Sequence, residues 1–513
     1  MPISDYYRGV DETVKRDDIR GTYRITITAQ YARALGRSLA DVLRSMTALP
    51  PINVVVGHDM RLSGPVLAEA LCQGLSAGGC RPIQMGLTGT ELVGFVVAHY
   101  SETIDGGVII TASHNPPTDN GFKFFGRGGQ PLPVAAAAAP SVPADELQRM
   151  ATVIKKSLVP ERLRWQEFAP DYVRTALKKG GLDFERAAAG ARKPLRIAVE
   201  AGNGMGGRVM REFAILCPQF EWVFSNEVPD GRFPIIVPNP LMPAYQKMVG
   251  ELVRNSGSHV GICFDGDADR VALADEDGQM LSPPLLAALI GRRLRDKLGP
   301  RARTAFNLEC SWAVPDTLGD RADVTGDGPV LITPVGYGRI KTIMHRNPDI
   351  AFGAEHSGHY MFRDFYTADS GMLAGLIVLE LAAELHAQGK TLSSAVRAMR
   401  ERYHGSGEIN FELPPDRPVE EVIARAVGQF KGEAVRMYAV ATDGVRAMDG
   451  YPPPFELGAA DVRVEAKNWW FCMRRSGTEG GLCRLYVEAD GSRRLMEEKL
   501  RALAELIGPQ YRT

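Results

Sequence analysis

The chain has few of the features that place a protein in an oxidising compartment or at a structural zinc site. Its seven cysteines are odd in number and scattered over 513 residues, and no Cys-x-x-Cys pair occurs. Disulfide frameworks and zinc sites use paired or regularly spaced cysteines. We therefore expect these cysteines to be small buried apolar residues in a reducing cytoplasm.

Long apolar runs and a strong net charge are also missing. No run approaches the roughly 18 apolar residues that predict a membrane-spanning helix, and residues 1–5 have neither a basic start nor an apolar core, so we expect no signal peptide. The net charge of −1 lacks the basic excess typical of proteins that bind the nucleic-acid backbone. These absences predict a cytoplasmic protein without a membrane or nucleic-acid partner.

The composition predicts a folded chain of several domains. With 45% hydrophobic and 24% charged residues it can bury sizeable cores, and its length suggests roughly three to four domains. Strand patterns alternate with helix patterns in the first part of the chain, which favours a sheet with parallel strands covered by helices. The succession of strand, small-residue loop and helix starts near residues 52, 195 and 304.

The pattern changes after about residue 400. Residues 408–413 and 462–465 alternate between apolar and polar, and residues 492–506 form an amphipathic pattern, which predicts a smaller α+β domain with an antiparallel sheet. The predicted fold class is α/β, with three similar mixed α/β domains and a smaller C-terminal α+β domain. The predicted domains are residues 1–160, 161–280, 281–400 and 401–513.

A serine loop follows one of the predicted strands. Residues 106–110 are an apolar β-branched run bounded by turn residues, so Ser113 should lie on the loop that leaves a strand end. Asn115 and Pro116 prevent an immediate helix, because the residue before proline avoids the helical region. A small hydroxyl on a stiff turn beside His114 suits a nucleophile or a carrier of a transferred group. The alternative is an ordinary loop serine beside an ordinary loop histidine.

An acidic loop lies between two further predicted strands, residues 260–264 and 271–274. Asp265, Asp267 and Asp269 alternate with Gly and Ala, which lets the loop fold three carboxylates onto one hard cation. An EF-hand is disfavoured because Arg270 stands at the sixth position, where the turn needs Gly, and because strands flank the loop. Three carboxylates suit Mg²⁺, which usually completes its shell with a phosphate oxygen. A solvated acidic turn is the alternative.

Two further loops carry polar groups. Residues 353–359 hold a carboxylate, a hydroxyl and two imidazoles, which suit sugar hydroxyls but also an ordinary polar turn. Residues 474–480 combine guanidinium groups, hydroxyls and glycines, the parts of a phosphate cradle, although a surface arginine pair is the alternative. Lys123 and Arg20 are single cations that, taken alone, would be surface residues.

The order of these loops resembles that of the α-D-phosphohexomutases, the family of phosphomannomutases and phosphoglucomutases. The resemblance runs from Asp18-Ile19-Arg20-Gly21 to residues 484–488 and rests on the Thr-Ala-Ser-His-Asn-Pro, Asp-Gly-Asp-Ala-Asp-Arg and Glu-His-Ser-Gly-His motifs. It implies four domains around one central cleft, each contributing one loop.

The resemblance also implies roles for individual residues. Ser113 would be the phosphoserine, and its phosphate oxygen would bind Mg²⁺ together with Asp265, Asp267 and Asp269. Arg270 and Lys123 would neutralise the transferred phosphoryl group, Lys123 or His359 would act as the general base, and His114 would orient the serine. The implied substrate contacts are Arg20, Tyr337, Glu355, Ser357, His359, Arg474, Ser476, Gly477 and Thr478.

The function implied is a phosphohexomutase that interconverts hexose 1-phosphate and hexose 6-phosphate of mannose, glucose or both. Hexose 1,6-bisphosphate would be the intermediate and activator, the partners would be small sugar phosphates, and the chain would be a monomer or small homo-oligomer. A Mg²⁺-dependent phosphatase or phosphotransferase and a non-catalytic sugar-phosphate binder are the alternatives. A phosphoglucosamine mutase is a further alternative, although such enzymes tend to have Gln where this chain has His356.

Several residues depart from the family pattern. Arg475 and Gly480 replace two prolines of the last motif, Tyr337 replaces a histidine, Glu309 stands where many relatives have Lys or Arg, and Asp17 replaces a frequent tyrosine. These changes touch substrate contacts, so they bear on which sugar is preferred and on whether the chain is active.

Overall fold

The computed structural model describes residues 13–14, 18–46, 51–130, 132, 161–319, 321, 324–441, 444–447, 461–476 and 481–512. The chain divides into two compact units. Unit 1 consists of Met1–Leu281 and Ser357–Leu392, and unit 2 consists of Ser282–His356 and Ser393–Thr513.

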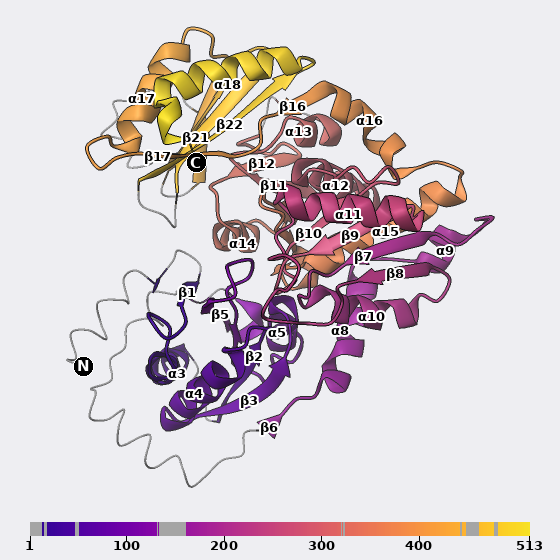
Figure 1. Cartoon of the computed structure of the whole chain (residues 1–513), viewed down its shortest axis with the longest axis vertical. Helices are drawn as coiled ribbons and strands as arrows, with labels where there is room; N and C mark the ends of the chain where they lie inside the picture. Colours follow the sequence, from indigo (N-terminus) through magenta and orange to yellow (C-terminus); the bar gives the residue numbers. More distant parts are fainter. Residues whose placement is uncertain are drawn as a thin grey trace. The chain divides into compact units, whose positions relative to one another are not determined.

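Unit 1 begins with a six-stranded mixed sheet in the order β1-β5-β4-β2-β3-β6. Its strands are β1 (Ile19–Thr22), β2 (Ile52–His58), β3 (Cys80–Leu87), β4 (Gly106–Ile110), β5 (Asp119–Gly126) and β6 (Glu161–Arg162). Strand β2 is parallel to β3 and β4, whereas β5 is antiparallel to β1 and β4. The associated helices are α3 (Ala29–Met46), α4 (Gly64–Ala77), α5 (Thr90–His99) and the 3₁₀ turn η1 (Arg127–Gly129). Helices α3 and α4 lie side by side next to this sheet (Figure 1).

The second sheet of unit 1 has the order β10-β9-β7-β8. Its strands are β7 (Arg196–Glu200), β8 (Glu221–Ser225), β9 (Val260–Phe264) and β10 (Val271–Ala274). Strand β7 is parallel to β8 and β9, and β9 and β10 form an antiparallel hairpin. Its helices are α8 (Trp165–Lys179), α9 (Phe184–Ala188), α10 (Gly206–Leu216) and α11 (Pro243–Ser256). The turn of the β9–β10 hairpin is the acidic loop.

The last segment of unit 1 carries a short hairpin and a buried helix. The hairpin strands are β14 (Tyr360–Phe362) and β15 (Ala368–Asp369), joined by the turn η3 (Arg363–Phe365), and α15 (Gly371–Ala387) follows. Helix α15 is apolar on nearly all sides because it is buried in the core, where it contacts β9, β10 and α9. Among the described residues no single helix is both long and apolar enough to cross a membrane.

Unit 2 contains a third group of parallel strands, in the order β12-β11-β13. They are β11 (Arg303–Asn307), β12 (Val330–Thr333) and β13 (Ile350–Ala354), with helices α12 (Pro283–Leu298), α13 (Ala313–Leu318) and α14 (Tyr337–Arg346). The carboxyl ends of parallel strands meet at one edge of a sheet, where ligands usually bind. Asn307, Thr333 and Glu355 lie at or just after those ends.

The C-terminal part of unit 2 is an antiparallel sheet covered by helices. The strands are β16 (Tyr403–Gly405), β17 (Ile409–Glu412), β18 (Arg436–Ala441), β19 (Gly444–Ala447), β20 (Val462–Glu465), β21 (Trp469–Arg475) and β22 (Leu482–Asp490). The helices are α16 (Leu392–Arg402), α17 (Val419–Phe430), α18 (Arg493–Ile507) and the turn η4 (Pro509–Tyr511). Helices α17 and α18 pack together on one face of β21 and β22 (Figure 1). This confirms the predicted fold class of mixed α/β domains followed by an α+β domain, while the four domain boundaries stay a prediction.

Candidate functional site

The serine loop leaves the carboxyl end of β4, as the sequence predicts, and buries Ser113 to 1% exposure. Ser113 adopts a left-handed backbone conformation with φ of 51°, which is uncommon for a residue with a side chain. Its Oγ donates a hydrogen bond to Asp265 Oδ2 (2.6 Å) and accepts one from Arg270 Nη2 (2.7 Å). His114 Nδ1 lies 3.2 Å from the same Oγ. The hydroxyl is therefore fixed between a carboxylate and two nitrogen-bearing side chains.

The acidic loop closes directly onto the serine loop. A Cβ added to Gly266 would lie 2.5 Å from the Ser113 carbonyl oxygen, so only glycine allows this approach. Asp265, Asp267 and Asp269 are buried, and each offers one carboxylate oxygen within 4.8 Å of those of the other two. The glycine thus brings the serine next to a cluster of three carboxylates.

The acidic cluster fits a divalent cation. Asp267 Oδ1 and Asp269 Oδ1 are buried and make no hydrogen bond to any of the described residues. A buried carboxylate oxygen without a partner is costly, and hard oxygen donors are the ligands that Mg²⁺ prefers. Asp265, Asp267 and Asp269 therefore form a donor set suited to Mg²⁺.

Lys123 on β5 is buried against this cluster. Its Nζ lies 2.7 Å from Asp267 Oδ2 and 2.5 Å from Asp269 Oδ2. Burial alone would lower the pKa of Lys123, but the two carboxylates outweigh burial and raise that pKa above its usual value. Burial likewise opposes the charged form of Asp267, yet Lys123 holds the pKa of Asp267 below its usual range. Lys123 therefore contributes a positive charge beside the serine.

Arg270 and His114 differ in charge although they touch. Arg270 Nη2 lies 2.7 Å from Asp265 Oδ2, and although burial opposes its charge, Asp265 and Asp269 raise the pKa of Arg270. Arg270 also contacts His114 Nδ1. Burial and the Arg270 charge both lower the pKa of His114, so His114 is neutral near pH 7.

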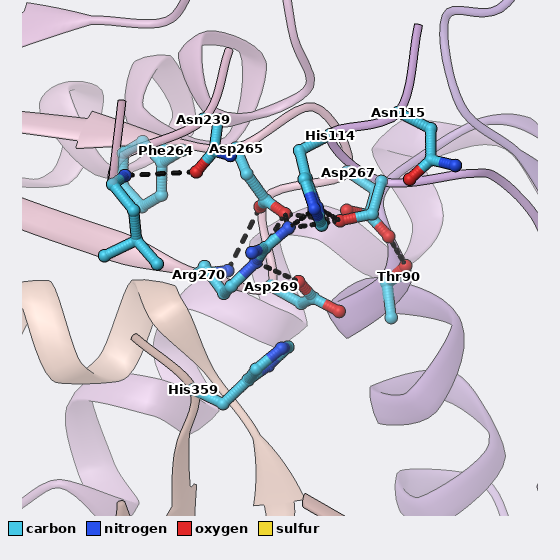
Figure 2. Close-up of polar contacts among 12 residues, drawn as sticks. Thr90, His114, Asn115, Asn239, Phe264, Asp265, Asp267, Asp269, Arg270 and His359 are labelled. Atoms are coloured by element: carbon cyan, nitrogen blue, oxygen red, sulfur yellow. Dashed lines mark hydrogen bonds and ion pairs between the residues drawn. The ribbon is translucent and has the colours of Figure 1, made fainter. Parts of the chain in front are cut away.

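His359 lies just before β14, and Figure 2 shows its ring on the side of Asp269. Its Nδ1 lies 2.5 Å from Asp369 Oδ2 on β15. Burial would lower the pKa of His359, but Asp369 and then Asp269 raise it. This ring is thus a candidate cation or proton donor, and Asp369 fixes its orientation.

Arg20 reaches the serine loop from the edge of the first sheet. On β1 it pairs with Gly121 of β5, and its Nη2 lies 2.7 Å from Asp18 Oδ2. Its Nη1 donates to Asn115 Oδ1 (3.1 Å), two residues after Ser113. The structure thus brings Arg20 to the serine loop, while its role as a substrate contact stays a prediction.

Glu355 lies in the polar loop of residues 353–359, in the part that belongs to unit 2. This residue is buried, and its Oε1 accepts a hydrogen bond from the Gly336 backbone N–H (2.6 Å). Tyr337, next to Gly336, is the first residue of α14, and its ring lies 5.4 Å from Lys341 Nζ. Glu355 and Tyr337 therefore belong to one turn region beyond β12 and β13, whereas Ser357 is half-buried and belongs to unit 1.

Arg474 at the end of β21 is held by two carboxylates of unit 2. Its Nε lies 3.0 Å from Glu309 Oε1 and its Nη2 lies 2.5 Å from Glu408 Oε2. His356 bridges the same acids, with Nδ1 2.7 Å from Glu309 and Nε2 3.2 Å from Glu408. Arg484 completes the cluster with Nη1 2.7 Å from Glu408 Oε1.

This unit 2 cluster is better suited to an anion than to a metal ion. Burial would lower the pKa of His356, but Glu309 and Glu408 raise it to about 10. Three cations, His356, Arg474 and Arg484, therefore surround two carboxylates and already supply the positive charge that a metal would bring. Ser476 Oγ lies 3.4 Å from Arg484 Nη2, while Gly477, Thr478 and Gly480 lie outside the described residues.

Three family profiles match this chain. They are described as phosphoglucomutase/phosphomannomutase, alpha/beta/alpha domain I, domain II and domain III, and they cover residues 11–139, 170–278 and 283–403. The chain belongs to the phosphoglucomutase/phosphomannomutase family. It is thus a phosphohexomutase by family, an isomerase-class intramolecular phosphotransferase, and the resemblance found in its motifs is confirmed.

Curated relatives of this family match almost the whole chain. The phosphomannomutase of Escherichia coli strain K12 is 32% identical over 499 residues, which is 96% of this chain and 98% of the relative. Proteins named phosphohexose mutases from Xanthomonas campestris pv. campestris are 31% identical over 497 residues, with the same coverage.

Solved structures of the family share the fold. A putative phosphomannomutase from Thermus thermophilus is 25% identical, has a TM-score of 0.71 and matches over 96% of this chain and 98% of its own. A phosphoglucomutase/phosphomannomutase family protein from Burkholderia thailandensis is 24% identical, with a TM-score of 0.73 and 98% of each chain covered. At 24% identity, the match to the Burkholderia thailandensis protein shows a shared fold and nothing more.

Several phosphohexomutase site residues had no signal in the sequence analysis. Thr90 at the start of α5 donates a short hydrogen bond to Asp267, and Asp369 orients His359. Glu408 binds Arg474, and so does Glu309, which the sequence had marked only as a departure from the family pattern. Thr90 could have been suspected because it follows the carboxyl end of a parallel strand, where sites gather. Asp369 and Glu408 stand in no recognisable motif.

Proposed function

We propose that this phosphohexomutase interconverts hexose 1-phosphate and hexose 6-phosphate of mannose, glucose or both, with Ser113 as the phosphoryl carrier. The observation that supports this most directly is the position of Ser113 Oγ. It lies 2.6 Å from Asp265 and 2.7 Å from Arg270, beside carboxylates that carry buried oxygens without hydrogen-bond partners among the described residues. A hydrolytic serine would need a strong base beside it, whereas a phosphate carrier needs positive charge around its phosphoryl oxygens.

In the forward half-reaction, phosphorylated Ser113 gives its phosphoryl group to the free hydroxyl of a hexose monophosphate. The bond between phosphorus and Oγ breaks, a bond to the sugar oxygen forms, the sugar hydroxyl gives up its proton, and Oγ takes up a proton to become a hydroxyl again. Of the two candidates for this proton, Lys123 is held protonated by Asp267 and Asp269 and supplies charge, so His359 in its neutral form is the group that accepts the proton directly or through water. The product is a bound hexose 1,6-bisphosphate.

In the return half-reaction, the bisphosphate presents its other phosphate to Ser113. The serine Oγ attacks that phosphorus and gives up the proton that it donates to Asp265 Oδ2 (2.6 Å), while neutral His114, 3.2 Å away, orients the hydroxyl. The bond from phosphorus to the sugar oxygen breaks, that oxygen takes a proton from protonated His359, and the isomeric monophosphate leaves. Ser113 is then phosphorylated again, so no inorganic phosphate accumulates.

Charge neutralisation supports both half-reactions. Arg270 and Lys123 face the serine and can bind the equatorial oxygens of the transferred group. Asp265, Asp267 and Asp269 would hold Mg²⁺, which when bound adds positive charge next to the phosphoryl oxygens.

The remaining substrate contacts follow from the family motifs. We assign sugar hydroxyls to Glu355 and Ser357, and Arg20 and Tyr337 to further substrate contacts. We assign the phosphate that does not react to Arg474, Ser476, Gly477 and Thr478. Arg474 is pre-oriented by Glu309 and Glu408, which supports a binding role for its guanidinium.

The test is a direct assay of the purified chain with Mg²⁺ and a trace of hexose 1,6-bisphosphate. Mannose, glucose and glucosamine 1-phosphates are compared side by side, and we expect 6-phosphate to form from mannose or glucose. Ser113→Ala should abolish turnover, and full activity of that variant would refute the mechanism. Release of inorganic phosphate in proportion to turnover would indicate a phosphatase, a preference for glucosamine 1-phosphate would indicate a phosphoglucosamine mutase, and binding without turnover would indicate a sugar-phosphate binder.

A further inference from the structure

Arg61 is a fully buried arginine directly behind the serine loop. It lies between β2 and α4 and is 1% exposed. A buried arginine is costly unless its N–H groups are all used by partners. The partners of Arg61 therefore show what the side chain does.

The Arg61 guanidinium donates to four backbone carbonyl oxygens of the serine loop. Nη2 donates to Ser113 O (2.9 Å) and Asn115 O (2.7 Å), and Nη1 donates to Pro116 O (2.5 Å) and Asp119 O (2.7 Å). Only a planar fork with several donors can bind so many carbonyls at once, and a lysine ammonium cannot reproduce that geometry. One side chain thus ties together the whole turn that presents Ser113.

Asp59 extends this contact to the backbone N–H of Ser113. Asp59 Oδ1 accepts from the Arg61 backbone N–H (2.9 Å), and Asp59 Oδ2 forms an ion pair with Arg61 Nε at 3.3 Å. The same Oδ2 accepts a hydrogen bond from Thr111 Oγ1 (2.7 Å), and Thr111 Oγ1 in turn accepts from the Ser113 N–H (2.8 Å). Both backbone polar groups of Ser113 are therefore held by Arg61 and Asp59, directly or through Thr111.

The backbone of Ser113 needs such support. Its φ of 51° lies in the left-handed region, which is unfavourable for a residue with a side chain and persists only where the surroundings fix it. That conformation sets the direction of Oγ. The Oγ contacts are Asp265, Arg270 and His114, so Arg61 acts only through the backbone.

We propose that Arg61 and Asp59 are positioning residues that hold the serine loop in the conformation from which Ser113 donates and receives the phosphoryl group. The proposal rests on the proposed function of Ser113 as carrier. It predicts that losing the Arg61 contacts misaligns Oγ relative to Asp265 and Arg270. A misplacement of about 1 Å at a reacting atom can lower a rate by about 100-fold.

The experiment compares Arg61→Met and Arg61→Lys with the unaltered chain. We expect kcat to fall by about 100-fold in Arg61→Met while KM for the hexose phosphate changes by less than about 3-fold, because Arg61 is buried behind the loop. Arg61→Lys should recover a small part of kcat, since it keeps the charge but not the fork.

A second readout does not depend on activity. Hydrogen exchange of the loop amides, which include those of Ser113, Asn115 and Asp119, should become at least about 10-fold faster in Arg61→Met, because the loop opens locally more often. If the unaltered chain shows no mutase activity, the proposed function fails, and the exchange rates still decide whether Arg61 holds the loop.

Arg303→Met is the matched control. Arg303 is another buried arginine that donates to backbone carbonyls, those of Gly326 and Gly328, but it lies at the start of β11 in unit 2. This variant should lower the melting temperature without changing kcat or exchange of the serine loop. If Arg61→Met behaves in the same way, with a lower melting temperature and unchanged kcat, the positioning role is refuted.

Thr111→Val keeps the proposal testable if Arg61→Met does not fold. It keeps the side-chain shape but removes the hydroxyl that links Asp59 to the Ser113 N–H. We expect kcat to fall by about 10-fold with faster loop exchange and unchanged KM. Unchanged kcat together with unchanged loop exchange would overturn the proposal.

Discussion

Asp267 and Asp269 each keep one buried oxygen without a hydrogen bond to any described residue, while their other oxygens bind Lys123. We predict that Asp267→Asn raises the Mg²⁺ concentration needed for half-maximal activity by more than about 10-fold, because a charged ligand becomes a neutral one. Titration of activity with Mg²⁺ measures the effect.

Asp275→Asn is the matched control for that change. Asp275 is equally buried, but its Oδ1 accepts hydrogen bonds from the backbone N–H groups of Asp277 and Gln279 in the next turn. It should lower stability and leave the Mg²⁺ requirement unchanged. An Asp267→Asn enzyme with the unaltered Mg²⁺ requirement would contradict the assignment of the acidic loop.

His356 makes the folded chain less stable as the pH rises. Its pKa is about 10 in the folded chain, raised by Glu309 and Glu408 against the effect of burial, whereas its usual value is 6.5. The folded state holds the proton more tightly, so this stabilisation is complete below about pH 6.5 and is lost as the pH rises toward 10. Its size is of the order of a few kcal/mol, since one pKa unit is worth about 1.4 kcal/mol.

We therefore predict that the melting temperature falls more between pH 6.5 and 10 in the unaltered chain than in His356→Gln. Thermal unfolding at several pH values measures this, and NMR of labelled histidines should show one imidazole that stays protonated to about pH 10 and disappears in the variant. Parallel melting curves for the two proteins across this range would show that the Glu309 and Glu408 contacts do not hold the proton.

The chemical types of the site residues could be predicted from the sequence, but their partners could not. Ser113 and the three aspartates were found because hydroxyls and carboxylates on loops after apolar strands are local patterns. The contact of Lys123 with Asp267 joins residues 144 positions apart, and no local pattern specifies such a pair. Glu309 stood out in the sequence only as a departure from the family pattern, and its pairing with Arg474 and His356 is a fact that only the folded chain reveals.

At the scale of elements, the approach of the serine loop to the acidic loop depends on Gly266. We predict that Gly266→Ala lowers kcat by at least about 10-fold, because the added Cβ would lie 2.5 Å from the Ser113 carbonyl oxygen and must push the two loops apart. Steady-state kinetics with saturating Mg²⁺ measures the loss. Gly432→Ala is the control, since a Cβ there has no atom within 4 Å, and equal kcat in both variants would refute the close contact.

The elements that carry the loops could be predicted more fully than the loops themselves. The strands expected at residues 106–110, 260–264 and 271–274 are observed as β4, β9 and β10. They could be predicted because a short apolar run bounded by turn residues usually forms a buried strand. The order of the strands within each sheet could not be predicted, because no local sequence pattern specifies it. The placement of β5 between β1 and β4 is fixed by contacts along the whole sheet.

At the scale of the whole molecule, the C-terminal sheet of unit 2 is tied to the loop after β11. Arg463 donates to Leu308 O (3.1 Å) and to Cys310 O, and its guanidinium lies 3.6 Å from the Trp470 ring centroid. Trp312 Nε1 donates to Glu465 Oε1 (2.9 Å). These contacts join two groups of strands into one stable unit.

We predict that Arg463→Met destabilises unit 2 selectively, because it leaves buried carbonyls without donors at a cost of about 1–3 kcal/mol each. Hydrogen exchange should speed up in β11, β20 and β22, while the slow amides of β2, β4 and β9 in unit 1 keep their rates. Equal acceleration in both units would mean that they unfold together.

The seven buried cysteines have a practical consequence for such measurements. Four lie in unit 1 and three in unit 2; they are Cys72, Cys80, Cys217 and Cys263, and Cys310, Cys472 and Cys483. Burial raises the pKa of every one of these thiols, that of Cys80 to about 11, so the native chain offers almost no thiolate to an alkylating reagent. A thiol can be alkylated only after the unit that buries it unfolds locally. Mass spectrometry of the labelled peptides would therefore measure the unfolding rate of each unit separately, without any engineered probe.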